Sequence, residues 1–401
     1  MEKIKRVASI KYCLLHGIYW MCFCLLFSFS SIYLLGKGFS NRQIGAILAI
    51  GGIIAVVCQS KVGELADRSD KITLRHIIVI LSSLSIIIAI FSLIFGNSIF
   101  AIRLFYIGMV VLLQIIMPLL NAVGMEFVNS GIPLNFGLAR GIGSLSFSIL
   151  ALFIGSYLEG RNPNLIMIVG IALYTLLLLV ALSFKIPKNI PTNCHNIDKN
   201  DEEFRISLEN QNKSGQISKT AFGFLLFGIV LIFSSHIVIN NFLFQITNWI
   251  GGTSSQMGIA MAICAFVELP TMYAYNFVSK KISTSSLIKL SALFFALKTL
   301  CTLLCKNMEL LYLVQLMQIF GFAIFTPSSV YFVNSVSSDG SKARAQALLG
   351  GAITLGGVLG NYFGGLIIEL SGVKMALISF SIIAFIGAGI IFSSARESYN
   401  S

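Results

Sequence analysis

The chain has 401 residues, of which 56% are hydrophobic and 11% are charged, and its mean hydropathy is +0.87. A soluble globular domain is about 25% charged, so this composition excludes an ordinary aqueous fold and requires lipid around most of the apolar surface. The formal net charge is +12, but no basic run is interleaved with aromatic residues, which excludes nucleic acid as the partner. We therefore predict an all-α polytopic membrane protein.

Twelve apolar stretches follow one another along the chain, each close to the ~20 residues that cross about 30 Å of hydrocarbon. The first follows a basic N-terminal segment without a cleavage site, so we expect a signal anchor that the protein retains. The fourth has the composition to continue past Glu126. The predicted spans are 12–35, 43–61, 75–95, 99–122, 138–158, 164–184, 219–247, 255–278, 286–304, 309–333, 344–367 and 373–394.

The stretch 185–218 is polar and contains nothing apolar enough to span a membrane. It predicts a cytoplasmic linker between two six-helix halves, 1–184 and 219–401. Most Lys and Arg residues fall on the side of this linker, so the positive-inside rule places both termini in the cytoplasm. Short segments of the first half resemble segments at the corresponding places of the second half; Gly141, for example, corresponds to Gly351. Such similarity is typical of a parallel six-plus-six repeat.

Charged side chains inside the predicted spans indicate function, because a charge at the bilayer centre costs at least ~2.5 kcal/mol. Glu268 and Lys298 lie deep in the eighth and ninth spans, where they either pair with each other or line a substrate cavity. Glu126 and Arg140 flank the predicted turn between the fourth and fifth spans, as an ion pair near the cavity or as a solvated loop pair. Uncharged polar residues complete the set: His236, Asn240, Asn241, Gln315, Gln318 and Asn361.

A charged segment follows the second predicted span and reads Gly-Glu-Leu-Ala-Asp-Arg over residues 63–68. It resembles the Gly-x-Leu-Ala-Asp-Arg signature of the major facilitator superfamily of transporters, in the turn between helices 2 and 3. The resemblance implies the major facilitator fold, with 12 transmembrane helices, a substrate site at the midplane and alternating access. It also implies a conformational latch on the inner face, formed by Gly63, Asp67 and Arg68, with Asp67 acting on a neighbouring helix end or basic residue.

Two further segments look like the phenylpropionate-permease and lactose-permease-like branch of that superfamily, which includes oligosaccharide:proton symporters. Residues 32–45 are similar to its helix 1–2 connection. Residues 135–147 are similar to the opening of its helix 5, with the pattern Phe/Tyr-Gly-Arg-x-Arg-x-x-Gly-Ser/Cys. The resemblance implies that Arg140, at the second Arg of the pattern, grips the substrate, although Leu138 replaces the first. It implies a sugar-binding role for Glu268, which matches a helix 8 Glu.

The chain departs from the lactose permease at the residues that couple protons there. The Lys, His and Glu of helix 10 are matched by residues that do not titrate: Gln315, Gln318 and Gly321. Lys298 stands at the helix 9 Arg, and the helix 7 Asp has no acidic match. Glu126 lies about one turn from the helix 4 acid of that branch. Glu268 is then the proton-coupling candidate, because it is the acid nearest the predicted midplane.

We predict a secondary active transporter of the cytoplasmic membrane that moves a small organic solute, sugar-like or an organic acid, by alternating access with proton symport. A polyol fits the amide and carboxylate groups, whereas an organic anion would use Arg140 and Lys298. The predicted substrate-binding residues are Glu126, Arg140, Asn240, Asn241, Glu268, Lys298, Gln315 and Gln318.

Other classes of protein are weighed against this interpretation. The missing helix 10 triad leaves a transporter-like sensor or an uncoupled facilitator as an alternative. A drug or metabolite exporter is disfavoured by the absence of a Gly-Pro pair from the fifth span, and a membrane enzyme by the absence of a polar surface cluster. No P-loop and no metal-ligand spacing occur, so we expect no cofactor and no metal. The expected partners are the solute, protons and lipid, and the expected state is a monomer.

Overall fold

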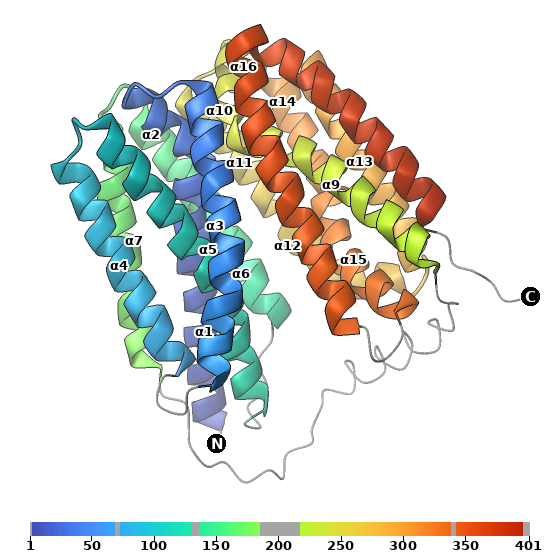
Figure 1. Cartoon of the computed structure of the whole chain (residues 1–401), viewed down its shortest axis with the longest axis horizontal. Helices are drawn as coiled ribbons and strands as arrows, with labels where there is room; N and C mark the ends of the chain where they lie inside the picture. The colour runs from blue at the N-terminus through green and yellow to red at the C-terminus, as the bar shows by residue number, and fades with distance from the viewer. Residues whose placement is uncertain (1, 69–72, 130–135, 185–216, 338–341, 396–401) are drawn as a thin grey trace, which may run out of the picture. The chain divides into compact units, whose positions relative to one another are not determined.

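The computed structural model describes residues 2–68, 73–129, 136–184, 217–337 and 342–395, and these residues contain helices and connecting turns without a strand. The chain forms two compact units, Met1–Asn196 and Ile197–Ser401, whose helices are coloured along the chain in Figure 1. The border between the units falls within the predicted linker 185–218. Nearly all of that linker lies outside the described residues, so its limits, and the domain limits at 184 and 219, stay predictions.

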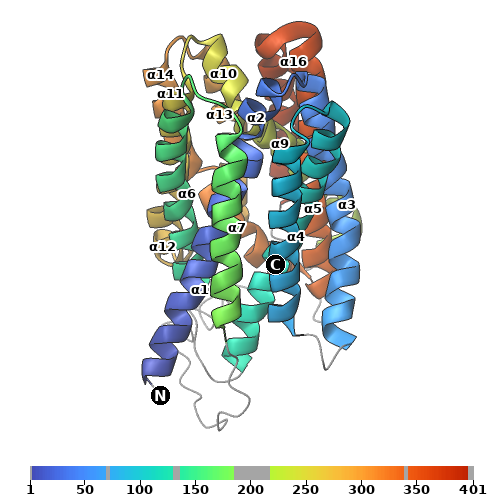
Figure 2. The ribbon, with the colours of Figure 1, turned by 90° about the vertical axis from the view of Figure 1, so that its left-hand side faces the viewer.

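Unit 1, as we call Met1–Asn196, is a bundle in which α1 packs along α6, α3 along α5, and α4 against both α5 and α7. Figure 2 shows α4 and α7 side by side. The start of α4 is set locally, because Thr73 and His76 form a capping box that satisfies free N–H groups of the first turn. The elements are α1 (Glu2–Phe23), a π-helical turn (Cys24–Ser28), α2 (Ser30–Gly36), α3 (Asn41–Arg68), α4 (Leu74–Ile94), α5 (Ile99–Asn129), α6 (Phe136–Leu158) and α7 (Leu165–Ser183).

Unit 2, as we call Ile197–Ser401, is built around α9 and α16, which pack along each other, with α13 beside them. Side-chain caps begin several of its helices, as Ser218 does for α9 and Ser283 for α13. The elements are α9 (Lys219–Asn241), α10 (Leu243–Trp249), α11 (Ser254–Phe266), α12 (Glu268–Ser279), α13 (Thr284–Leu304), α14 (Met308–Gln315), a 3-10 turn (Leu316–Ile319), α15 (Phe322–Val336) and α16 (Lys342–Ser394).

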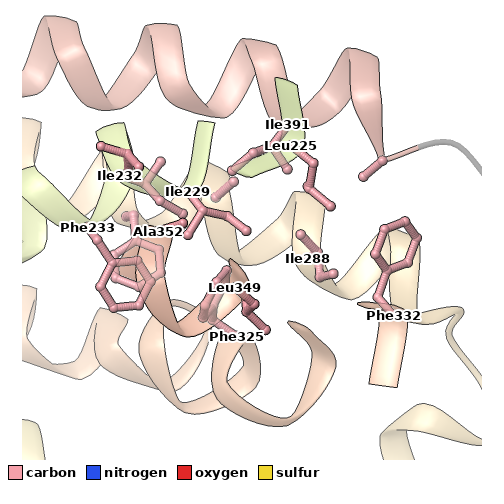
Figure 3. Close-up of a cluster of buried hydrophobic side chains, with 14 of the residues drawn as sticks. Leu225, Ile229, Ile232, Phe233, Ile288, Phe325, Phe332, Leu349, Ala352 and Ile391 are labelled. Carbon is pink, nitrogen blue, oxygen red and sulfur yellow. The ribbon is translucent and has the colours of Figure 1, made fainter. Parts of the chain in front are cut away.

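The long element α16 is two helices joined at Gly372. This residue has a φ of +83°, in the left-handed region that glycine adopts without strain, so the chain turns back there. Figure 1 shows the two arms of α16 running in opposite directions. Their side chains meet in one core cluster, shown in Figure 3, where Leu349 and Ala352 of the first arm lie with Ile391 of the second, against α9.

The helices have the length and composition of membrane spans. Among the described residues, eleven helical stretches are long and apolar enough to cross a membrane. The last, Arg344–Ser394, has 51 residues and turns at Gly372, so it supplies two crossings. Large apolar side chains also point outward, as Phe100 and Phe153 do with 74% and 72% of their surface exposed. Such a surface suits lipid rather than water, and each predicted span has a helical counterpart.

The predicted turn at Gly63–Arg68 is wrong, because these residues form the last turns of α3. The physical reason is that a helix need not end where its apolar stretch ends, and Leu65 and Ala66 favour helix. The fourth predicted span does continue past Glu126, as its composition allows. Glu126 lies inside α5, which continues past it to Asn129.

Four predicted spans are interrupted rather than continuous, which hydropathy alone does not reveal. The first is broken by the π-helical turn Cys24–Ser28, and the seventh at Phe242. The eighth is broken at Val267 and the tenth by the 3-10 turn that ends before Gly321. Three of these four breaks are in unit 2, and two of them place polar residues of the candidate site.

Candidate functional site

A buried hydrogen-bonded network in unit 2 joins Lys298, Gln318 and Glu268. The Nζ atom of Lys298 donates to Oε1 of Gln318 at 2.7 Å, and Nε2 of Gln318 donates to Oε1 of Glu268 at 3.0 Å. The three side chains are only 2%, 3% and 7% exposed. The amide of Gln318 thus connects an ammonium and a carboxylate, with its oxygen toward the cation and its N–H toward the anion.

Local backbone breaks bring Glu268 and Gln318 to this network. Pro270 has no N–H to donate to the carbonyl of Phe266, and α11 ends at Phe266. Glu268 is therefore in the first turn of α12, where the positive end of the helix dipole favours a carboxylate. Gln318 lies in the 3-10 turn Leu316–Ile319, between α14 and α15. Each is held at the interruption of a span rather than along a regular helix face.

Lys298 comes from an uninterrupted helix, α13, and is the anchor of the network. Besides Gln318, its Nζ atom lies 3.5 Å from Sγ of Cys264 on α11. A buried ammonium requires such partners, since transfer of an unpaired charge out of water is very unfavourable. The network therefore ties α11, α12, α13 and the 3-10 turn together through polar groups.

Asn240 and Asn241, which are adjacent in the sequence, have different partners. The amide nitrogen of Asn240 lies 2.9 Å from Nε2 of His236, one turn earlier on α9. Asn241 donates to Oδ1 of Asn361 on α16 at 2.7 Å. Successive helical residues are about 100° apart around the axis, so one amide serves its own helix and the other joins two helices. Asn241 is thus held in a contact between α9 and α16.

His236, one of the uncharged polar residues of the seventh predicted span but not one of the predicted substrate-binding residues, lies beside Asn240. Its ring stacks on Phe322 with centroids 5.2 Å apart and meets Phe295 edge-on at 5.0 Å. Gln315, at the end of α14, is 1% exposed, and its Nε2 atom has no hydrogen-bond partner among the described residues. These buried polar groups lie in the same unit as the Lys298 network.

Arg140 lies in unit 1, on α6, and is stacked on an aromatic ring of α1. Its guanidinium carbon is 4.0 Å from the centroid of the Trp20 ring, and its Nη1 atom donates to Oγ of Ser144 at 2.6 Å. A guanidinium over an indole face is a favourable cation–π arrangement that fixes the plane of the Arg fork. Arg140 stands out in the sequence as a charge near a span, whereas Trp20 does not, because an aromatic residue in an apolar span carries no distinguishing signal.

The remaining predicted residues are placed as follows. Glu126 is half-buried on α5, in unit 1. Gly63 lies in α3, and a Cβ atom added there would meet nothing within 4 Å. Asp67 and Arg68 also fall in α3, but their side chains are outside the described part of the chain. The latch therefore stays a prediction. Among the described residues, no group of His, Cys, Asp or Glu is arranged to hold a metal ion.

Comparison with known proteins identifies the family. The model of the MFS_1 like family matches residues 10–379, which is most of the chain. The chain belongs to this family of major facilitator transporters. The predictions of an all-α membrane protein with the major facilitator fold, and of a transporter rather than an enzyme, are thereby confirmed.

Individual relatives of this transporter are distant. The maltose permease of Geobacillus stearothermophilus is 23% identical over 392 residues, covering 96% of this chain and 94% of the permease. The uncharacterized transporter YwbF of Bacillus subtilis (strain 168) is 22% identical and covers 88% of this chain and 84% of YwbF. Among solved structures, the nucleoside transporter NupG has a TM-score of 0.74 with 17% identity, covering 96% of this chain and 98% of NupG. The chain is thus an integral membrane transporter of the major facilitator type, with the fold that NupG also has.

Proposed function

We propose that this protein is a secondary active transporter that moves a small sugar-like solute by alternating access, coupled to protons. The observation that carries the proposal is the buried network of Lys298, Gln318 and Glu268. A carboxylate within a span is unfavourable unless it has a functional role or a partner of opposite charge. Here the amide of Gln318 donates a hydrogen bond that Glu268 can accept in either protonation state. Glu268 is our proposed coupling residue.

The amide of Gln318 makes this assignment chemically consistent. A carboxylate and a carboxylic acid both have an oxygen that accepts an N–H, so protonation of Glu268 leaves the 3.0 Å bond from Nε2 possible. What changes is the charge that opposes Lys298. Protonation therefore alters the electrostatic balance across α12, α13 and the 3-10 turn, and this is the differential interaction that shifts a population between two states.

The polar groups favour a hydroxylated solute over an organic acid. In unit 2 the positive charge of Lys298 is already opposed by Glu268 through Gln318. The groups that remain there, Gln315 and the pair His236–Asn240, are amide and imidazole groups that suit hydroxyls. The similarity to a protein named maltose permease supports the same class. Arg140 and Glu126 are the proposed contributions of unit 1 to binding.

The experiment is uptake of labelled maltose, lactose and uridine into proteoliposomes with an imposed pH gradient, acid outside. We expect accumulation that a protonophore abolishes. Glu268→Gln should lose accumulation but retain exchange of labelled for unlabelled solute, since Gln keeps the shape without cycling a proton. Glu309→Gln is the matched control, because Glu309 is also in the first turn of a helix, α14, but is exposed.

Different results in this experiment would contradict parts of the proposal. Uptake that ignores the pH gradient indicates an uncoupled facilitator. Full pH-driven accumulation by Glu268→Gln removes this residue from coupling. Absence of transport for every solute, with the protein folded and inserted, favours a transporter-like sensor.

A further inference from the structure

The least satisfied polar groups of unit 1 lie one helical turn apart on α1. His16 is 3% exposed, and neither of its ring nitrogens has a hydrogen-bond partner among the described residues. The Nε1 atom of Trp20 is likewise buried without a partner there. A buried donor or acceptor without a partner lowers the stability of a fold, and such atoms at i and i+4 fall on one helix face. Sites that reduce stability in this way are often sites of function.

The neighbouring helix α6 holds the indole of Trp20 in place. A Cβ atom on Gly143 would lie 2.3 Å from Cδ1 of Trp20, so only glycine lets the indole lie this close to α6. Arg140 covers the indole face at 4.0 Å and bonds to Ser144. Arg140 therefore covers the ring and α6 lies against its Cδ1 corner, while the Nε1 atom has no hydrogen-bond partner among the described residues.

We propose that the ring nitrogens of His16 and Trp20 form a subsite for vicinal hydroxyl groups of the transported solute, next to Arg140. This proposal rests on the proposed function and narrows it to hydroxylated solutes. A neutral imidazole offers one donor and one acceptor, and an indole offers one donor. A carboxylate only accepts, so it leaves the imidazole acceptor unsatisfied. Two hydroxyls, each of which donates and accepts, satisfy all three nitrogens.

The composition of the chain provides a direct probe of this subsite. Trp20 is one of only two tryptophans, and the other, Trp249, is 40% exposed at the end of α10 in unit 2. In a Trp249→Phe background, Trp20 is the sole indole, and its fluorescence reports on its surroundings. We expect maltose, lactose or uridine to change this emission saturably. We expect 3-phenylpropionate, a carboxylate without hydroxyls, to leave it unchanged.

Binding of the same labelled solutes to the purified protein measures the contribution of each ring. His16→Phe and Trp20→Phe keep a ring but remove its hydrogen bonding, and each should raise the Kd about tenfold, the effect of one lost hydrogen bond. His16→Gln, which keeps a donor and an acceptor, should bind more tightly than His16→Phe. Trp249→Phe is the matched control and should leave the Kd unchanged.

Thermal unfolding separates this role from a structural one. His16→Phe removes two unsatisfied nitrogens, so its Tm should be equal to or above that of the wild-type protein while its Kd rises. A lower Tm with an unchanged Kd would overturn the subsite and leave the proposed function standing. Binding of 3-phenylpropionate in place of the three hydroxylated solutes would overturn both, as would the failure of the wild-type protein to bind any of them.

Discussion

The Lys298 network of unit 2 and the His16–Trp20 pair of unit 1 differ in how their polar atoms are satisfied. In unit 2, Lys298, Gln318 and Glu268 form a continuous network, and Asn241 is bonded to Asn361. In unit 1, the ring nitrogens of His16 and the Nε1 atom of Trp20 have no partner among the described residues. A satisfied network stabilises and orients its members, whereas unsatisfied groups lower stability. The network of Lys298, Gln318 and Glu268 therefore helps to hold the fold of unit 2, whereas the ring nitrogens of His16 and Trp20 are left for the solute.

Interruptions of the spans are also distributed unequally between the two units. The spans of unit 1 after α2, from α3 to α7, are each one continuous helix. In unit 2 the breaks at Val267 and around the 3-10 turn lie next to Glu268 and Gln318. An interrupted helix frees backbone groups that neighbouring structure must satisfy, so it requires a surrounding that fixes it. The network of unit 2 is thus also what holds these interruptions in place.

The largest effect is expected from breaking the network at Lys298. Lys298→Met keeps the length of the side chain but removes the charge that opposes the buried Glu268 through Gln318, and removing one partner of a buried pair costs about 3–5 kcal/mol. The double variant Lys298→Met with Glu268→Gln should regain most of that loss, because it removes the uncompensated charge as well. Chemical denaturation in detergent measures both. If the double variant is no more stable than the single one, the two charges are not coupled through Gln318.

A smaller effect, on binding rather than on stability, is expected from Arg140. Arg140→Lys keeps the charge but removes the planar fork and its stack on Trp20, so we expect a loss of about 2 kcal/mol in binding, roughly a thirtyfold rise in Kd. The Tm should change little, since the main-chain packing of α1 and α6 is kept. Equilibrium binding of labelled maltose, lactose and uridine measures it, and an unchanged Kd would exclude Arg140 from the site.

The fold could be predicted from the sequence because a lipid solvent permits few solutions. Long apolar stretches separated by polar turns are required for each crossing, and these are visible without tertiary information. The interruptions were missed because hydropathy averages over a window and treats Pro270 as one more residue. The end of α3 was misplaced for a related reason, since Leu65 and Ala66 continue a helix beyond its apolar part.

The sequence predicted the charged and polar residues of the candidate site, but not the hydrogen bonds that connect them. Glu268, Lys298 and Gln318 were each identified, since a polar residue inside a span stands out. That Gln318 bridges the other two depends on the 3-10 turn, which rotates residues 316–319 away from the regular helical spacing. His16 and Trp20 were not identified, because a missing partner is a property of the packed interface between α1 and α6 and leaves no pattern in the chain.

The smallest effect is expected at Asn361. It is a sharp test of the comparison between the two units, because the expected changes in Tm differ in sign between Asn361→Leu and His16→Phe. Asn361→Leu removes the acceptor of Asn241, and interhelical hydrogen bonds in membranes are worth about 0.6 kcal/mol on average and up to about 1.7. We therefore expect a modest loss of stability in unit 2, measured as a lower Tm. His16→Phe, also the replacement of a buried polar side chain by an apolar one, should have the opposite sign or none, because it breaks no bond to a described residue. If both variants lower the Tm equally, the polar groups of the two units serve the fold alike. If only Asn361→Leu lowers it, the unsatisfied nitrogens on α1 are retained for something other than stability.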